Sequence, residues 1–243
     1  MSRPNRSTGM LASVTSLREA ALALQWGADI IDLKNPSEGA LGALPLAAVS
    51  AIVKFVAGRK PVSATVGDLT AMEPMALRQA VTSMAATGVD YVKAGFFPGR
   101  NLTACVEALS RPARDGAAIV AVLFADSGVK HGLLGELALH GFTGVMLDTA
   151  VKDGRSLRDH LRIEEIRAFV QEAKARGLLT GLAGSLSEKD IPHLLPLRPD
   201  YLGFRGGLCR GGQREQQLDQ AAFDGVRDAV LQVYQPVLSD HCG

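Results

Sequence analysis

Charged residues stand where short apolar segments end, and their types suit carbonyl chemistry. The segment ADIIDLKNPSEGALGA (28–43) carries Asp32 and Lys34, YVKAG (91–95) carries Lys93, and VMLDTAVKDG (145–154) carries Asp148 and Lys152. A lysine that loses part of its hydration beside other positive charges has a lowered pKa, so it can act as a nucleophile or base near neutral pH. These five residues therefore predict Schiff-base formation with a carbonyl substrate.

A structural interpretation of each residue stays open at this stage. A lysine at a strand end commonly extends its ammonium group to water, and an aspartate there can simply accept hydrogen bonds from loop amides. Three lysines near one another favour a functional interpretation. Because residues two apart on a strand share a face, we expect Asp32 to hold Lys34 and to carry its protons. Asp68 and Asp126, which follow two other apolar segments, are weaker candidates.

The segments that must position these residues alternate between apolar runs and helical patterns. Apolar stripes such as Ile163, Ile166, Val170 and Ala173 predict the helices. Eight runs are predicted strands: 10–14, 30–33, 61–66, 91–94, 117–124, 144–148, 178–183 and 201–204. Eight such units predict a single α/β domain, a (β/α)8 TIM barrel over residues 1–243 with short tails at 1–8 and 237–243.

Residues typical of helix starts and helix ends support these boundaries. Ser16 with Glu19 predicts a capping box at the start of the first helix. Four glycines predict the C-terminal ends of helices: Gly27, Gly58, Gly88 and Gly177. The seventh helix is the weakest, because Pro192, Pro196 and Pro199 crowd it.

Glycine clusters follow the last two predicted strands. In barrels, the loops at these positions commonly bind phosphate through backbone N–H groups. We expect Gly184, Ser185, Gly206 and Gly207 to present such groups and Arg205 to add a positive charge. The alternative is that these glycines serve only turns and helix ends.

Composition narrows the class of partner. The formal net charge is +1 and aromatic residues make up 5% of the chain, so nothing favours nucleic-acid binding. No apolar run is long enough to cross a membrane. Cys105, Cys209 and Cys242 are widely spaced, and the histidines share no spacing, so we expect no metal or other cofactor. We expect a cytoplasmic protein that acts on small molecules, and a homo-oligomer is possible.

Six motifs in one order resemble a known enzyme family. They are GADIIDLKNPSEGALGA, VSATVGD, GVDYVKAGF, VMLDTAVKDG, LAGS and FRGGLCRGGQR, and the similarity runs from about Leu11 to Val233. The family is (5-formylfuran-3-yl)methyl phosphate synthase, also called 4-(hydroxymethyl)-2-furancarboxaldehyde-phosphate synthase. The resemblance implies a carbon–oxygen lyase acting on phosphates. It would condense two molecules of glyceraldehyde 3-phosphate, with loss of phosphate and water, to the furan precursor of methanofuran, a carrier in one-carbon metabolism.

The resemblance also implies roles for the charged residues. Lys34 matches the Schiff-base lysine of the family and Lys93 its proton-transfer lysine, while Asp32, Asp148 and Lys152 match the other charged residues of the site. No metal or organic cofactor is implied. Two alternatives remain, a class I aldolase for another phosphorylated sugar and a non-catalytic barrel that binds a phosphorylated metabolite.

Overall fold

A computed structural model describes residues 8–99, 101–128 and 132–232. Apart from Thr8, the tails expected at 1–8 and 237–243 lie outside the described residues, as does Cys242. Two cysteines, Cys105 and Cys209, are buried free thiols.

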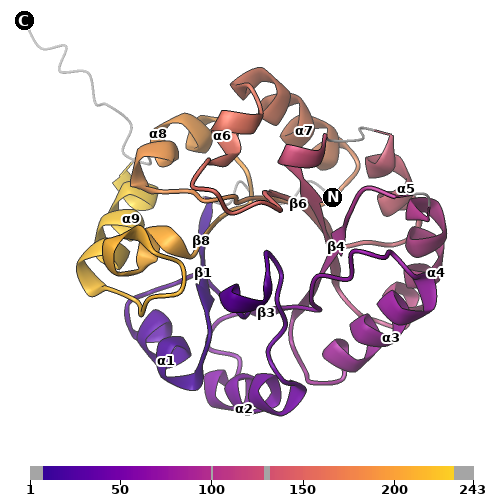
Figure 1. Cartoon of the computed structure of the whole chain (residues 1–243), viewed down its shortest axis with the longest axis horizontal. Coiled ribbons are helices and arrows are strands. Elements are labelled where there is room, and N and C mark those ends of the chain that lie inside the picture. Colours follow the sequence, from indigo (N-terminus) through magenta and orange to yellow (C-terminus); the bar gives the residue numbers. More distant parts are fainter. Residues whose placement is uncertain (1–7, 100, 129–131, 233–243) are drawn as a thin grey trace, which may run out of the picture.

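Eight parallel strands close into a barrel, as the sequence predicts (Figure 1). Each strand pairs with the next in the chain, and β8 returns to β1 through the register of Gly9 with Tyr201. The strands are β1 (Gly9–Val14), β2 (Ile30–Leu33), β3 (Val62–Thr65), β4 (Tyr91–Phe96), β5 (Ile119–Phe124), β6 (Gly144–Asp148), β7 (Leu179–Leu182) and β8 (Tyr201–Phe204).

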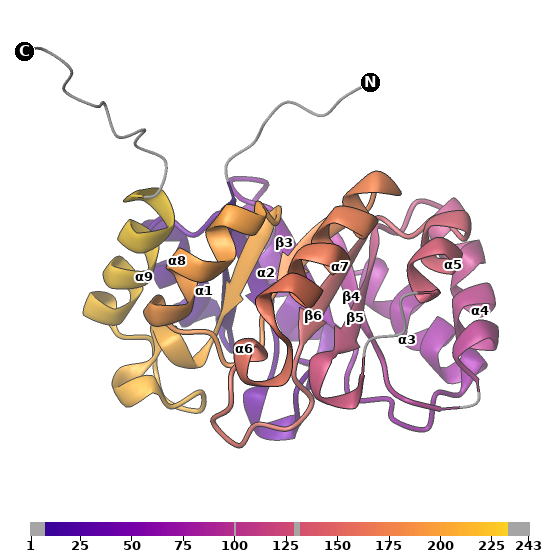
Figure 2. The same cartoon turned by 90° about the horizontal axis from the view of Figure 1, so that it is seen from above.

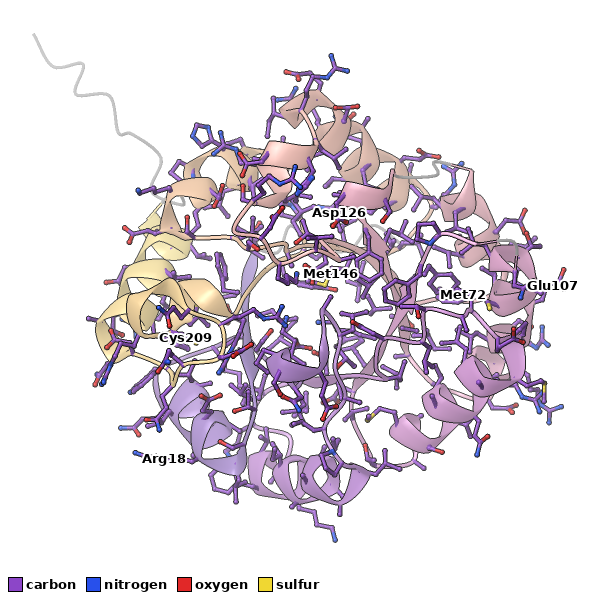
Figure 3. All side chains as sticks on the ribbon, viewed as in Figure 1. Arg18, Met72, Glu107, Asp126, Met146 and Cys209 are labelled. Carbon is purple, nitrogen blue, oxygen red and sulfur yellow. The ribbon has the colours of Figure 1, made fainter. Side chains whose placement is uncertain are left out.

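The helices form a ring around this barrel (Figures 1 and 2). Their buried apolar residues belong to one core cluster with those of the strands. Figure 3 shows Met146 of β6 near the centre of the ring, whereas Arg18 and Glu107 point outwards from α1 and α4. The helices are α1 (Leu17–Gln25), α2 (Leu46–Val56), α3 (Pro74–Ala85), α4 (Leu102–Arg114), α5 (Leu133–Leu139), α6 (Leu157–His160), α7 (Ile163–Ala175), α8 (Ile191–Leu194) and α9 (Gln220–Gln232).

The turns that lead into the strands follow the sequence signals. All four glycines predicted at helix ends have positive φ, between +72° and +90°. The weak seventh helix is also confirmed. α8 has four residues and lies between two 3₁₀ turns, with Pro192 at its first turn.

The predicted capping box of α1 forms only in part. Ser16 Oγ accepts a hydrogen bond from Glu19 N at 3.2 Å, as expected. The Glu19 carboxylate does not return the bond to Ser16 N. It accepts from Thr15 N and Oγ1 and from the Arg205 guanidinium. A buried charged partner from the loop after β8 thus takes the place of the second capping bond.

Candidate active site

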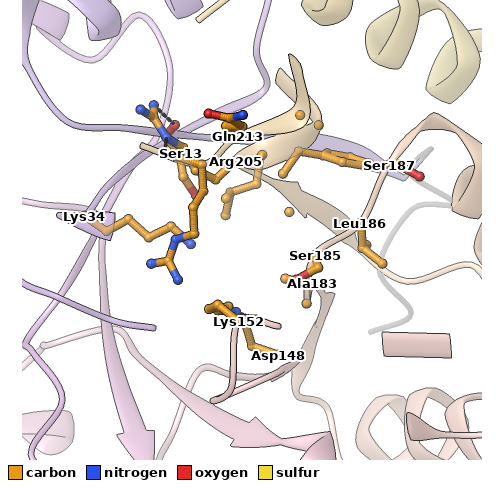
Figure 4. A pocket seen from close by; sticks show the side chains of 18 of the residues that line it. Ser13, Lys34, Asp148, Lys152, Ala183, Ser185, Leu186, Ser187, Arg205 and Gln213 are labelled. Atoms are coloured by element: carbon orange, nitrogen blue, oxygen red, sulfur yellow. Dashed lines mark hydrogen bonds and ion pairs between the residues drawn. The ribbon is translucent and has the colours of Figure 1, made fainter. Parts of the chain in front are cut away.

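A cavity of about 470 Å³ opens at the carboxyl ends of the strands. Four of the five charged residues predicted from the sequence line it: Lys34, Lys93, Asp148 and Lys152. Figure 4 shows the Lys34 and Lys152 side chains extending into the same space, with Asp148 beside Lys152. The fifth residue, Asp32, lies directly behind the wall, where it contacts Lys93.

Asp32 and Lys93 form a buried ion pair, 2.8 Å between Oδ1 and Nζ. Ser63 Oγ donates to the same oxygen at 2.6 Å, and Ser13 Oγ donates to Oδ2 at 2.8 Å. Burial alone would raise the pKa of Asp32, but the charges of Lys93 and Lys34 and these hydrogen bonds hold it below the usual value. Asp32 is therefore an ionised carboxylate with both oxygens occupied.

This geometry corrects the expectation that Asp32 holds Lys34. Both residues do share a face, but two residues along a strand separate them by about 6.6 Å. Lys93 reaches Asp32 from β4, and the serines of β1 and β3 occupy its other lone pairs. No hydrogen bond joins Asp32 to Lys34 within the described ranges.

Asp148 and Lys152 form a second ion pair inside the cavity. Lys152 Nζ lies 2.7 Å from Asp148 Oδ1 and 3.2 Å from Thr149 Oγ1. Burial acts to raise the pKa of Asp148, whereas Lys152, Lys34 and the Thr149 N–H lower it, and the net pKa is below the usual value. This pair presents a cation with a fixed carboxylate at the rim of the cavity.

Lys34 differs from the other two lysines because no carboxylate of the described chain lies within salt-bridge distance of it. Its side chain is buried, with 8% exposed, and its Nζ faces the cavity. Burial lowers the pKa of Lys34 to about 8; Lys93 and Lys152 add to this decrease, and Asp148 and Asp32 oppose it. Part of the population therefore carries a neutral, nucleophilic amine near neutral pH.

Carboxylates on neighbouring loops fix the segments that carry these lysines. Asp68, after β3, accepts hydrogen bonds from Ala40 N and Leu41 N in the loop that follows Lys34. Asp126, after β5, accepts from the backbone N–H groups of residues 150 and 151, just before Lys152. Both weaker candidates of the sequence therefore act on loops rather than on a substrate.

Lys93 also borders a second cavity, of about 460 Å³, at the opposite end of the barrel. Tyr91 and Tyr201 line this cavity close to the amino ends of their strands. The Asp32–Lys93 pair thus separates two open spaces inside the barrel. Its lysine, which is 2% exposed, borders both of them.

The loops after β7 and β8 present unpaired backbone N–H groups to the main cavity. No described residue accepts a hydrogen bond from the N–H groups of Gly184, Ser185, Gly206 or Gly207, and all four residues line the cavity. The two loops also touch, because a Cβ on Gly207 would lie 2.8 Å from Leu186 O. The glycines therefore serve close packing, and they also leave donors free for an anion.

Arg205 does not extend into this anion position. Its guanidinium forms a buried ion pair with Glu19, at 2.6 Å between Nη1 and Oε2. The remaining N–H groups donate to the carbonyl oxygens of Ser13, Arg214 and Gln216. With all its donors used, Arg205 is a structural residue, so the geometry argues against the phosphate contact expected for it.

Arg214 is a cavity residue that was not predicted from the sequence. This half-buried residue lines the cavity from the loop after β8. Its Nη2 donates a hydrogen bond to Gly39 O, in the loop after β2. The available signal was a third arginine in the run RGGLCRGGQR, but nothing local distinguishes its direction from that of Arg205 or Arg210.

Two further properties of the described residues bear on cofactors and membranes. No group of three or more histidine, cysteine, aspartate or glutamate side chains among them is arranged to hold a metal ion. None of the helices described here has the length and apolar character needed to cross a membrane.

A family model and two known proteins that this chain resembles belong to one enzyme family. The family model described as 4-HFC-P synthase matches residues 10–227. A (5-formylfuran-3-yl)methyl phosphate synthase of Methanopyrus kandleri is 39% identical over 218 residues, 85% of this chain and 92% of its own. A Methylorubrum extorquens protein that bears the same name in provisional form is 45% identical over 221 residues, 91% of each chain.

Comparison with solved structures confirms the fold. A 3-hexulose-6-phosphate synthase from Salmonella typhimurium superposes with a TM-score of 0.66 at 16% identity, covering 93% of this chain and 99% of its own. A 3-keto-L-gulonate-6-phosphate decarboxylase from Vibrio cholerae gives a TM-score of 0.65 at 12% identity, covering 95% of this chain and 100% of its own. At such low identity the similarity concerns the barrel alone.

Proposed function

Because the chain belongs to the 4-HFC-P synthase family, we propose that it condenses two molecules of glyceraldehyde 3-phosphate to (5-formylfuran-3-yl)methyl phosphate through an imine on Lys34. One inorganic phosphate and water leave as the furan ring closes. This makes the protein a carbon–oxygen lyase acting on phosphates. Its product would be the furan precursor of a methanofuran-type one-carbon carrier.

The observation that carries the proposal is the state of the Lys34 amine. A nucleophilic lysine must lose its proton before it attacks a carbonyl, and burial lowers the pKa of Lys34 to about 8. No described carboxylate is bonded to Nζ, so the amine is not held as an ion pair. It faces a cavity with room for small phosphorylated substrates.

Lys93 and Asp32 supply proton transfer in this proposal. Imine formation and dehydration require a group that donates a proton to the departing hydroxyl and later takes one back. The ammonium group of Lys93 lines the same cavity as Lys34 and is held by the ionised Asp32 carboxylate. Asp32 thus orients Lys93 and does not receive protons from Lys34 directly.

The Asp148–Lys152 pair acts on the other side of the reacting carbons. Among the described residues, Lys152 Nζ has only Asp148 and Thr149 as partners, so it can still donate to a substrate oxygen. A protonated lysine near a developing alkoxide stabilises it and can protonate it. The contact with Asp148, 2.7 Å between Nζ and Oδ1, holds Lys152 in place.

The loops after β7 and β8 bind a substrate phosphate in this proposal. The free N–H groups of Gly184, Ser185, Gly206 and Gly207 supply donors at the wall of the cavity. Ser185 has a left-handed backbone, with φ of +49°. Such strain is typical of ligand-binding loops. Arg205 supports the loop after β8 through hydrogen bonds to its carbonyl oxygens and does not contact the phosphate in this proposal.

Incubation with glyceraldehyde 3-phosphate alone tests the proposal. We expect a product with the mass of the furan phosphate, near-ultraviolet absorbance and release of inorganic phosphate. A six-carbon sugar phosphate without ultraviolet absorbance would instead indicate a class I aldolase. Unchanged substrate, with no adduct reducible by borohydride, would indicate a barrel that only binds a phosphorylated metabolite.

We also infer a cytoplasmic location. Cys105 and Cys209 are buried and unpaired, as in proteins that fold in a reducing compartment. Triose phosphates are intermediates of central metabolism, so the proposed substrate fits that compartment.

A further inference from the structure

Arg214 occupies an unusual place in the cavity. Its backbone belongs to the loop after β8, and its side chain reaches the carbonyl oxygen of Gly39, in the loop after β2. Of its five N–H groups, only this one has an acceptor among the residues that the structure describes. No described carboxylate lies within salt-bridge distance. The guanidinium therefore faces the cavity with most of its donors unused.

Arg205 holds the backbone of Arg214 and its neighbours in place. Arg205 Nε donates to Arg214 O at 2.7 Å, and Arg205 Nη2 donates to Gln216 O at 2.9 Å. Arg205 is in turn fixed by its buried ion pair with Glu19. The ion pair thus fixes the backbone of the loop. Most N–H groups of the Arg214 side chain remain available for a ligand.

Most cations of the cavity wall have a carboxylate partner among the described residues, and Arg214 does not. Three cations of the cavity wall are neutralised by direct partners: Lys93 by Asp32, Lys152 by Asp148 and Arg205 by Glu19. Lys34 and Arg214 remain, and Lys34 must be neutral to form an imine. Glu215, also in the wall, is exposed to solvent. Arg214 is therefore the permanent positive charge of the cavity that a ligand can still neutralise.

The proposed reaction brings two phosphate groups to this cavity. The N–H groups of the loops after β7 and β8 offer one anion position. The guanidinium, whose Nη2 is hydrogen bonded in the loop after β2, offers another. Arginine binds phosphate through two parallel hydrogen bonds and cannot lose its charge at physiological pH.

We propose that Arg214 binds a phosphate group of a triose substrate at this second anion position and so makes the enzyme select phosphorylated over unphosphorylated trioses. The proposal rests on the proposed function for the identity of the substrate. Its anion site can be measured without turnover.

Borohydride trapping with two substrates tests the selection. We expect Arg214→Gln to slow adduct formation with glyceraldehyde 3-phosphate by about 10- to 100-fold, the range for loss of a hydrogen bond to a charged group. The rate with glyceraldehyde, which has no phosphate, should stay within about twofold of wild type. Arg214→Lys should fall between the two, because it keeps the charge and loses the paired geometry. Equal losses with both substrates would show that Arg214 only supports the loop, and would overturn the proposal.

Calorimetric titration with inorganic phosphate separates this proposal from the proposed function. Wild type should bind phosphate, and Arg214→Gln should weaken the affinity by about tenfold or more. Arg210→Gln is the matched control, since Arg210 is exposed in the same loop and does not line the cavity. Unchanged affinity in Arg214→Gln, or an equal loss in Arg210→Gln, would contradict a specific site. If wild type binds phosphate through Arg214 but makes no furan, only the proposed function fails.

Discussion

Three lysines line one cavity, and the presence or absence of a carboxylate partner distinguishes their roles. Lys93 and Lys152 each have a carboxylate within 2.8 Å, so attraction opposes the cost of burying their charge. Lys34 has no such partner among the described residues. Burial therefore acts on it most directly, and its amine is the one prepared for attack. This assignment follows from environment, because the three side chains are chemically identical.

The pH dependence of adduct formation should follow the Lys34 amine. Since its pKa is lowered to about 8, the neutral fraction should rise about tenfold between pH 6 and pH 7 and level off above pH 8. We expect the rate of borohydride-trapped adduct formation to follow this curve, with Lys34→Arg showing no adduct at any pH. A rate that keeps rising towards pH 10 would mean that the amine has an ordinary lysine pKa.

Replacing Lys34 should stabilise the fold while it removes activity. A pKa lowered from 10.5 to about 8 means that the protonated amine is unfavourable in the folded state. We expect Lys34→Met to raise the free energy of unfolding at pH 7 by about 1–3 kcal/mol. Urea unfolding measures it, and Lys54→Met, exposed on α2, is the control with an expected change within about 0.5 kcal/mol.

The sign of this effect can be checked by varying the pH. Below pH 8 the amine is protonated in both states, so the full penalty is present in wild type. Between pH 8 and 10.5 the unfolded chain keeps a proton that the folded chain has lost, so wild type gains stability as the pH rises. The advantage of Lys34→Met should therefore shrink above pH 8. A variant less stable than wild type at pH 7 would show that attraction to Asp148 and Asp32 outweighs burial.

At two places on the rim, a carboxylate that follows one strand holds the loop after a neighbouring strand. Asp68 after β3 binds two successive N–H groups in the loop of β2, and Asp126 after β5 does the same for the loop of β6. Each loop so held carries one of the cavity lysines. The same kind of anchor thus appears twice around the rim, from the following strand for the loop of β2 and from the preceding strand for the loop of β6.

Gly39→Ala should break the first of these anchors. A Cβ at Gly39 would lie 1.9 Å from Asp68 Oδ2, and φ there is +106°. We expect a loss of about 2–4 kcal/mol in unfolding free energy and a strong loss of activity, because the loop after Lys34 must move. Gly58→Ala is the matched control, with φ of +72° and nothing within 4 Å of the added Cβ. It should cost about 1 kcal/mol, with activity unchanged. Equal effects of both substitutions would leave only backbone strain as the cause.

The sequence predicted which charged residues gather at the rim, and it did not predict how they pair. A residue's place at a strand end follows from local patterns, and all strands of this barrel share one direction. The partner of Asp32 depends instead on how far the Lys93 side chain reaches across from β4, and on serines of β1 and β3. That information lies in the register between strands, which periodicity along one strand does not contain.

For the whole molecule, closure of the barrel is what brings distant segments together. The prediction of a (β/α)8 barrel succeeded because eight apolar runs, with helical patterns between them, leave few other topologies. The roles of the β8 loop were harder to predict. Arg205 and Arg214 lie nine residues apart in a glycine-rich run, yet one is buried against Glu19 of α1 and the other faces the cavity. What distinguishes them is the ion pair that joins Arg205, in the loop after β8, to Glu19 of α1.

Peptide mapping after borohydride reduction identifies the lysine that forms the covalent intermediate, which we propose to be Lys34. With glyceraldehyde 3-phosphate present, we expect a reduced adduct on the peptide that contains Lys34, and none in Lys34→Arg. Lys93→Gln should still give the adduct, while its turnover falls by about 10²- to 10⁴-fold, as expected for loss of a general acid–base group. An adduct on the peptide that contains Lys93 or Lys152, with the Lys34 peptide unmodified, would show that Lys34 is not the nucleophile.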